Sequence, residues 1–201
     1  MEQALWREID SDTKASLMLS LEALGDSRAA FVEILNQSLR AEEEARVRLA
    51  AALILARRAG PDVAPQVARV LLDSIANEEA VSHSYVFSVW DKEPAKEACD
   101  AVSGIGANFA IASLLNLLPV VGNKLAAYSI VDTLMEMNFQ QTWGGEKVSP
   151  LELTEVQRRV LTAFAGTSSI WQGNAMKTLE WHYGLPGDRE KLQQFLREEA
   201  E

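Results

Sequence analysis

Hydrophobic residues in this chain recur at intervals of three and four, the spacing that places them on one face of an α-helix. Leu17, Leu21 and Leu24 follow this spacing, and Gly25 then suits the left-handed turn after a helix. Ser27 is expected to start the next helix, whose apolar face would contain Phe31, Ile34, Leu35 and Ser38. The sequence has no stretch of regular apolar/polar alternation, so the pattern predicts helices and no strands.

Two further helices are predicted by their apolar faces and their ends. Residues 42–59 form the first, because Arg57 and Arg58 suit the negative end of the helix dipole and Gly60 stops the helix. Its apolar stripe is Val47, Ala50, Ala51, Ile54 and Leu55. The second covers residues 62–77 and is expected to bury Val67, Val70, Leu71 and Ile75.

The middle of the chain is punctuated by proline and glycine. We expect helices over residues 81–90, 94–103, 108–118 and 122–139, with Pro94 in the first turn of the second. The longest loop is predicted at residues 140–149.

Capping residues define the last three predicted helices. Ser149, followed by Pro150 and by Glu152, predicts a capping box and a helix that stops at Gly166. Another helix is expected to run from Ser168 or Ser169 to Tyr183, and the last to start after Asp188 and end near residue 199.

Glycines occupy similar places in four of these segments. Each follows an Ala/Leu-rich helix and precedes a polar turn and a second helix; they are Gly25, Gly60, Gly106 and Gly166. Glycine permits the tight reversal that lays two helices antiparallel, and the next helix pair can cover the apolar face that remains. The spacings of 35, 46 and 60 residues are unequal. The pattern therefore predicts an irregular helical-repeat stack, with a compact irregular bundle as the rival fold.

Two of these segments resemble HEAT repeats of the armadillo-type α-solenoids. The likeness lies in the small and apolar positions of residues 46–65 and 98–118. The resemblance implies an all-α fold: an irregular HEAT-like α-α superhelix of about 10–11 helices in a single domain over residues 1–201. Such stacks usually bind other proteins along a groove, so it implies a protein partner and says little about activity.

The charge balance favours a protein partner over nucleic acid. The chain has 19 Lys+Arg against 29 Asp+Glu and a net charge of −10, whereas binding to phosphates requires a cationic surface. The densest basic cluster contains acidic residues as well, so we interpret it as a solvated helix surface; it consists of Arg40, Arg46, Arg48, Arg57 and Arg58. A partner of this acidic chain is expected to be a basic protein.

The cysteine and the chain start indicate a cytoplasmic protein. Cys99 is the single cysteine, which excludes an internal disulfide, and residues 1–12 are polar and unlike a signal peptide. Residues 101–123 carry no charge but contain asparagines, glycines and Pro119, which suit two buried helices better than a membrane span.

No catalytic, cofactor-binding or metal-binding residues are predicted. Glu79 and His83 stand four residues apart, but a stable metal site needs more ligands, so a surface pair is the better interpretation. Asp100 and Asp132 lie in apolar sequence surroundings. A buried acid could serve as a general acid or base, although helix capping or an arginine pair is the more ordinary role.

Tryptophans are the candidate partner-binding residues. The chain has five, and four lie at helix ends or in loops: Trp90, Trp143, Trp171 and Trp181. Trp171 and Trp181 are expected to share one helix. Aromatic residues at such edges often anchor partners, although filling of core gaps is the ordinary alternative for each.

Three functions follow from these features. The first is a non-enzymatic protein-protein interaction or scaffold module that uses a helical-repeat groove. The second is a small acidic immunity or inhibitor protein that binds a basic toxin. The third, disfavoured by the acidic charge, is an enzyme resembling the HEAT-like DNA glycosylases.

Overall fold

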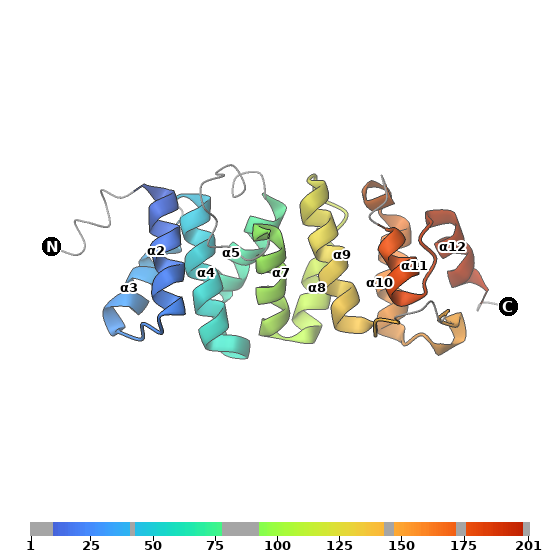
Figure 1. The fold of residues 1–201 in the computed structure, drawn as a ribbon, viewed down its shortest axis with the longest axis horizontal. Helices are drawn as coiled ribbons and strands as arrows, with labels where there is room; N and C mark the ends of the chain where they lie inside the picture. The colour runs from blue at the N-terminus through green and yellow to red at the C-terminus, as the bar shows by residue number, and fades with distance from the viewer. Residues whose placement is uncertain (1–9, 41–42, 78–92, 143–146, 172–175, 199–201) are drawn as a thin grey trace. The chain divides into compact units, whose positions relative to one another are not determined.

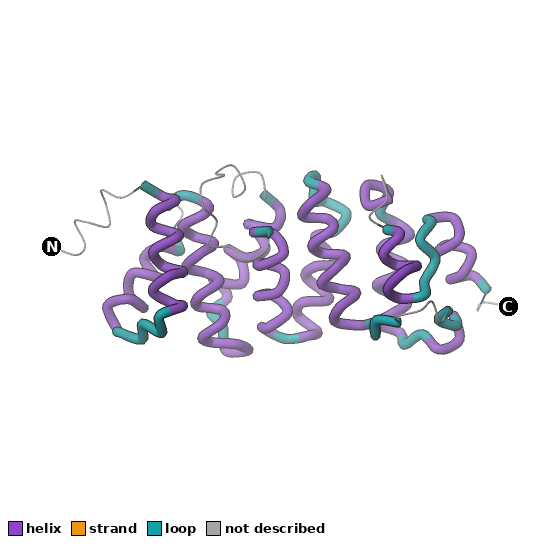
Figure 2. Tube along the Cα trace, in the orientation of Figure 1, coloured by secondary structure: helices purple, strands orange, loops and turns teal. Residues whose placement is uncertain are grey.

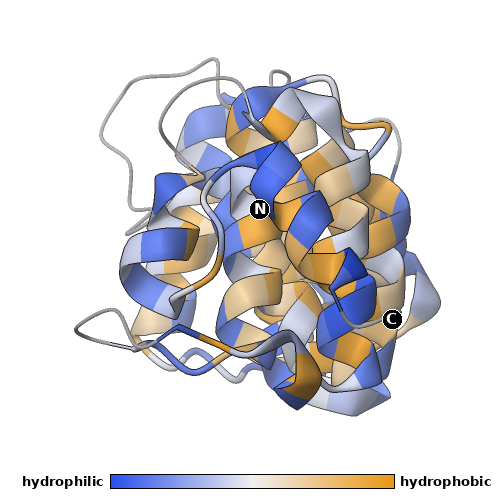
Figure 3. Cartoon of the chain, turned by 90° about the vertical axis from the view of Figure 1, so that its right-hand side faces the viewer, coloured by the Kyte–Doolittle hydropathy of each residue, from blue (hydrophilic) through white to orange (hydrophobic). Residues whose placement is uncertain are grey.

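The computed structural model describes residues 10–40, 43–77, 93–142, 147–171 and 176–198. All regular structure in these ranges is helical, with ten α-helices and three short 3-10 helices (Figure 2), which confirms the all-α prediction. The helices carry hydrophobic and hydrophilic residues on the same ribbon (Figure 3), as amphipathic helices do. Contacts divide the chain into two compact units, Met1–Ala110 and Ile111–Glu201.

In the first unit, α4 (Ala45–Ala59) contacts α2 (Ser11–Ala23) on one side and α7 (Pro94–Ile105) on the other (Figure 1). α3 (Ala29–Ser38) and α5 (Pro65–Ala76) pack against α4 as a second layer, and α5 also contacts α7. The first helices of successive helix pairs therefore lie side by side, the arrangement expected when helix pairs stack.

Three of the four repeat glycines end helices of this unit with a positive φ. The φ angles are 76° at Gly25, 54° at Gly60 and 156° at Gly106. Gly60 follows α4 directly and lies in a region of backbone conformation that strains residues with a Cβ. The short η1 (Gly60–Asp62) then leads into α5, and α8 (Ala107–Leu117) follows Gly106 and spans the boundary between the units.

α4 is surrounded on all sides. Val47 and every residue from Leu49 to Ile54 are 0% exposed, as expected for a helix that is apolar around its whole circumference. The predicted stripe is buried except for Leu55, which is half-buried. The four predicted apolar residues of α5, Val67 to Ile75, are also buried.

The predicted leucine face of α2 is wrong. The buried residues are Ala15 and Met18, whereas Leu17 is 38% exposed and Leu24 is 83% exposed. α2 packs against the alanine-rich α4, and the contact uses a face that is displaced from the leucines by part of a turn. Leu24 is the C-terminal cap residue, outside the regular helix.

The second unit contains α9 (Lys124–Asn138), α10 (Glu155–Gly166), α11 (Lys177–Tyr183) and α12 (Arg189–Arg197). α10 contacts both α9 and α12, and it also contacts the 3-10 helix η3 (Ser168–Trp171). The core of the second unit includes fully buried side chains from several elements: Leu118, Ile130, Leu134, Val160, Leu161, Phe164 and Leu192.

The predicted capping box at Ser149 is wrong. Ser149 makes no side-chain capping hydrogen bond and precedes only the short η2 (Pro150–Glu152). The capping box lies five residues later, where Thr154 and Gln157 exchange side-chain to backbone bonds of 2.8 and 3.2 Å. Both segments match the local pattern of a helix start, and the packing of α10 in this unit decides between them.

Two other predictions for this region need correction. Gly166 is the last residue of α10, and the fourth glycine with positive φ is Gly184 instead. Trp171 lies in η3 and Trp181 in α11, so they do not share a helix. The predicted helix over residues 81–90 lies outside the described residues. Among the residues that are described, no helix is long and apolar enough to cross a membrane.

Candidate functional site

The four candidate tryptophans have different surroundings. Trp90 and Trp143 lie outside the described residues. Trp171 is half-buried, and its indole Nε1 donates a hydrogen bond of 2.8 Å to the backbone oxygen of Phe164, which is typical of a structural residue. Trp181 is 67% exposed on α11. Of the two described tryptophans, Trp181 is therefore the one available to a partner.

The end of α11 is formed by a glycine cap. Gly184 has a φ of 63°, in the left-handed region, and the Leu185 amide donates to the Leu179 oxygen over 3.1 Å. The Gly184 amide donates to the same oxygen, so a left-handed glycine closes the C-terminal end of α11. Leu179 and Leu185 are both 1% exposed, so the same turn places an apolar floor beside the helix end.

A second glycine lets the chain between α11 and α12 lie close to α11. A Cβ on Gly187 would stand 3.3 Å from the Cα of Lys177 and 3.3 Å from the backbone oxygen of Met176. Asp188 follows, and its Oδ1 accepts the amides of Glu190 and Lys191 at 3.0 and 3.2 Å, which confirms it as the cap of α12. Gly187 therefore lies against the start of α11, one residue before the cap of α12.

Residues before η2 form another wall of the site. The amide of Thr142 donates to the backbone oxygen of His182 over 2.7 Å. The amide of Val148 donates to the backbone oxygen of Gly184 over 3.4 Å. These bonds hold Thr142 and Val148 against the C-terminal end of α11. Pro150 and the rest of η2 follow immediately.

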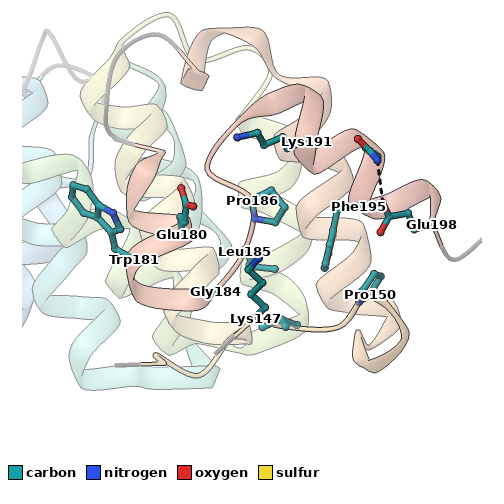
Figure 4. A pocket seen from close by; sticks show the side chains of 12 residues that line it. Lys147, Pro150, Glu180, Trp181, Gly184, Leu185, Pro186, Lys191, Phe195 and Glu198 are labelled. Carbon is teal, nitrogen blue, oxygen red and sulfur yellow. Dashed lines mark hydrogen bonds between the residues drawn. The ribbon is translucent and has the colours of Figure 1, made fainter. Parts of the chain in front are cut away.

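These segments enclose a groove of about 930 Å³ (Figure 4). Its lining mixes polar and apolar residues; of the apolar ones, Leu185 is buried and Val148, Pro150, Pro186 and Phe195 are half-buried. In Figure 4, Pro186 lies between α11 and Phe195, whereas the Trp181 indole extends from the other side of α11, at the edge of the site, and points away from both. The exposed lining residues are Trp181, Lys147, Glu180, Lys191, Gln194 and Glu198.

The charged residues of the groove comprise two cations and two anions. No ion pair joins Lys147, Lys191, Glu180 or Glu198 within the described part of the chain. Glu198 Oε1 accepts a hydrogen bond of 3.2 Å from Gln194 Nε2, its neighbour one turn earlier in the sequence. The groove is thus close to electroneutral in a chain of net charge −10.

The basic cluster predicted in the first unit has a structural role. Arg46 pairs with Asp12 of α2 at 2.6 Å, Arg57 pairs with Glu97 of α7, and Arg58 pairs with Glu22 of α2. Three of the five clustered arginines therefore connect α4 to its neighbours.

The two acids with apolar sequence neighbours are not buried. Asp132 is exposed on α9. The side chain of Asp100 is 30% exposed and pairs with Lys96 at 2.8 Å, one turn away on α7. Neither acid is therefore enclosed in the apolar surroundings that its sequence neighbours suggested. Cys99, beside Asp100, is buried.

Metal ligands do not gather in the described residues, where no group of three or more His, Cys, Asp or Glu side chains could hold an ion. Glu79 and His83 lie outside the described residues. The polar side-chain groups that line the groove are two amines, two carboxylates, one amide and the Trp181 indole N–H, all on exposed residues.

No protein-family model, no curated protein and no solved structure matches this chain. The fold defines the class, which is an all-α protein whose first unit stacks helix pairs side by side.

Sequence reasoning named Trp181 as one of four candidate tryptophans and did not name the other groove residues. Phe195, Pro186 and Lys147 come from three separate segments that no single sequence pattern connects. Two sequence features mark the segment between α11 and α12, which contributes to the groove. They are the Gly184-Leu185-Pro186 turn and the Asp188 cap.

Proposed function

We propose that this protein is a non-enzymatic protein-binding module and that the groove beside Trp181 is its contact surface. The observation that carries the proposal is the exposure of Trp181, 67%, next to an apolar interior formed by Leu185, Pro186 and Phe195. Tryptophan is enriched among residues that dominate binding energy, because it presents a large rigid surface with a polar N–H.

We further propose that the chain is an irregular member of the HEAT or armadillo type of α-solenoid. The side-by-side packing of α2, α4 and α7, with α3 and α5 in a second layer, supports this assignment. The positive-φ glycines at positions 25, 60 and 106 recur at the ends of the first helices of the pairs. Proteins built in this way offer extended surfaces to other proteins.

The charges favour a protein over a nucleic acid as partner. Arg46, Arg57 and Arg58 are paired with carboxylates of neighbouring helices, so their charge is largely compensated within the first unit. The net charge of −10 repels phosphate and attracts basic proteins. An acidic inhibitor of a basic protein is accordingly the second candidate function. Cys99, a single buried thiol, supports a cytoplasmic location.

Affinity capture of the full-length protein tests the proposal. The bait is compared with Trp181→Ala and with Val120→Ala, a control at an apolar residue that is 73% exposed and does not line the groove. A partner that binds the wild type and the Val120 variant should lose at least about tenfold in affinity with Trp181→Ala, measured by calorimetry with purified components. Equal binding by all three proteins would place the contact surface elsewhere.

Salt dependence separates the two candidate functions. Capture through the apolar groove should survive an increase from low to moderate salt, because burial of apolar surface is not screened. An acidic inhibitor should lose its basic partner over the same increase.

A further inference from the structure

We infer that the groove face beside Trp181 is a self-association surface, so that its partner is a second copy of this chain. The inference rests on the proposed function of the groove and names the partner of that site. It is drawn from the sign and placement of the charges around the apolar interior.

The lining residues carry both signs of charge in equal number. Lys147 and Lys191 are exposed, as are Glu180 and Glu198, and no ion pair joins them in the described part of the chain. In Figure 4 the two lysines lie on opposite sides of Leu185 and Pro186, while Glu198 lies near the Phe195 end. The face is therefore a mosaic of charges around an apolar centre.

Such a mosaic suits a two-fold symmetric contact. In an isologous dimer the same surface is used twice, so it must be complementary to itself. A surface with one sign of charge repels its copy, whereas a surface with both signs can place the lysines of one copy against the glutamates of the other. Opposite charges at the edge then select the register of the pair, and the apolar centre supplies most of the affinity.

The charge of the remaining surface favours this face in particular. Two copies of a chain with net charge −10 repel each other in most orientations. The groove face, with two lysines and two glutamates, is a face where that repulsion is locally absent. Trp181, a lining residue at the edge of this face, is 67% exposed and is therefore available to the same contact.

The size of the surface predicts a weak dimer. Twelve residues line the groove, whereas a stable standard-size interface uses about 20–30 residues on each side. We therefore expect an equilibrium between monomer and dimer rather than a permanent assembly.

The experiment is sedimentation equilibrium of the full-length protein over a concentration series up to about 1 mM. The wild type should shift from monomer to dimer, and Trp181→Ala should raise the dissociation constant at least about tenfold. Val120→Ala, exposed and outside the groove, should dimerise like the wild type. Circular dichroism spectra verify that each variant is folded.

Charge reversal in both directions identifies the face. The variant Lys147→Glu/Lys191→Glu and the variant Glu180→Lys/Glu198→Lys should each be monomeric, because each makes the face single-signed. An equimolar mixture of the two should form a heterodimer. Lys177→Glu, an exposed reversal on α11 that does not line the groove, should leave dimerisation unchanged.

A wild type that stays monomeric throughout the series overturns the inference, and so does a dimer that withstands Trp181→Ala and both charge variants. Neither result decides the proposed binding function. If the wild type is monomeric yet captures a foreign protein that Trp181→Ala loses, the groove binds proteins and only the second copy is rejected.

Discussion

The charged residues around α4 and those around the groove are arranged in opposite ways. On α4, Arg46, Arg57 and Arg58 each meet a carboxylate of a neighbouring helix, and the backbone between them is enclosed by packed side chains. Around the groove, Lys147 and Lys191 have no ion pair with described residues. The charges of the first region serve its internal packing, and those of the second are available to a partner.

The two regions also differ in how far their apolar side chains are exposed. The first unit buries its apolar side chains at the centre of a helix stack, whereas the groove region leaves Trp181 67% exposed. We therefore expect substitutions around α4 to change the free energy of unfolding and substitutions around the groove to change binding.

The largest effect should come from the centre of α4. Leu53→Ala removes a side chain that is 0% exposed and leaves a cavity, so the free energy of unfolding should fall by about 2–5 kcal/mol. Urea denaturation followed by circular dichroism measures it. Leu24→Ala, at a leucine that is 83% exposed, should change it by less than about 0.5 kcal/mol. Similar losses for both variants would contradict the central position of α4.

The next effect concerns the turn that forms the groove floor. Gly184→Ala places a Cβ on a residue with φ of 63° and should destabilise the protein by about 1–2 kcal/mol. Gly166→Ala is the matched control in the same unit, since no atom outside its own helix backbone and chain neighbours would lie within 4 Å of its added Cβ, and its φ is not positive. Thermal unfolding of both variants tests this difference. Because the turn also holds Val148, partner binding should weaken with Gly184→Ala alone.

A smaller effect is expected at the junction of α2, α3 and α4. The guanidinium of Arg58 bonds to the Glu22 carboxylate and to the backbone oxygen of Asp26, and it lies 5.2 Å from the centre of the Phe31 ring. The Arg58 and Glu22 side chains are 26% and 22% exposed, so solvent reduces the value of the pair. Arg58→Ala should cost about 1 kcal/mol.

Lys191→Ala is the comparison for Arg58→Ala, because Lys191 is exposed on the groove edge. Its stability should be unchanged within about 0.5 kcal/mol, measured by the same denaturation curves. A loss equal to that of Arg58→Ala would show that the groove charges also stabilise the fold and would remove the contrast between the two regions.

The smallest effect is a pH dependence at Asp26. Hydrogen bonds from the Arg28 side chain, with a smaller contribution from the Arg28 amide, lower the pKa of Asp26 from 3.8 to about 2. A lowered pKa in the folded state means that this carboxylate stabilises the protein above pH 3.8 and that the contribution is lost as the pH falls through about 2.

Asp26→Asn should therefore reduce the pH dependence of the melting temperature between pH 3.8 and about pH 2. Thermal melts across this pH range measure the difference between the variant and the wild type. Parallel curves for the two proteins would contradict the assignment of the lowered pKa to Asp26.

Local sequence signals predicted much of the fold. The helical class, the glycine stops at positions 25 and 60, proline in the first turn of α7 and the Asp188 cap all involve residues within a few positions of one another. Local signals failed where two segments offered the same pattern: Ser149 and Thr154 both resemble helix starts, and only Thr154 caps an α-helix.

The sequence by itself determined that the described chain is helical, because apolar periodicity and caps act over one or two turns. Only the tertiary structure decided which face of α2 is buried, which carboxylates meet Arg46, Arg57 and Arg58, and that Trp181 borders a groove. The groove joins residues 147–150 to residues 180–198, about 30 positions later, through backbone bonds at Gly184 and the close approach at Gly187. Contacts between segments so far apart depend on packing, which periodicity does not encode.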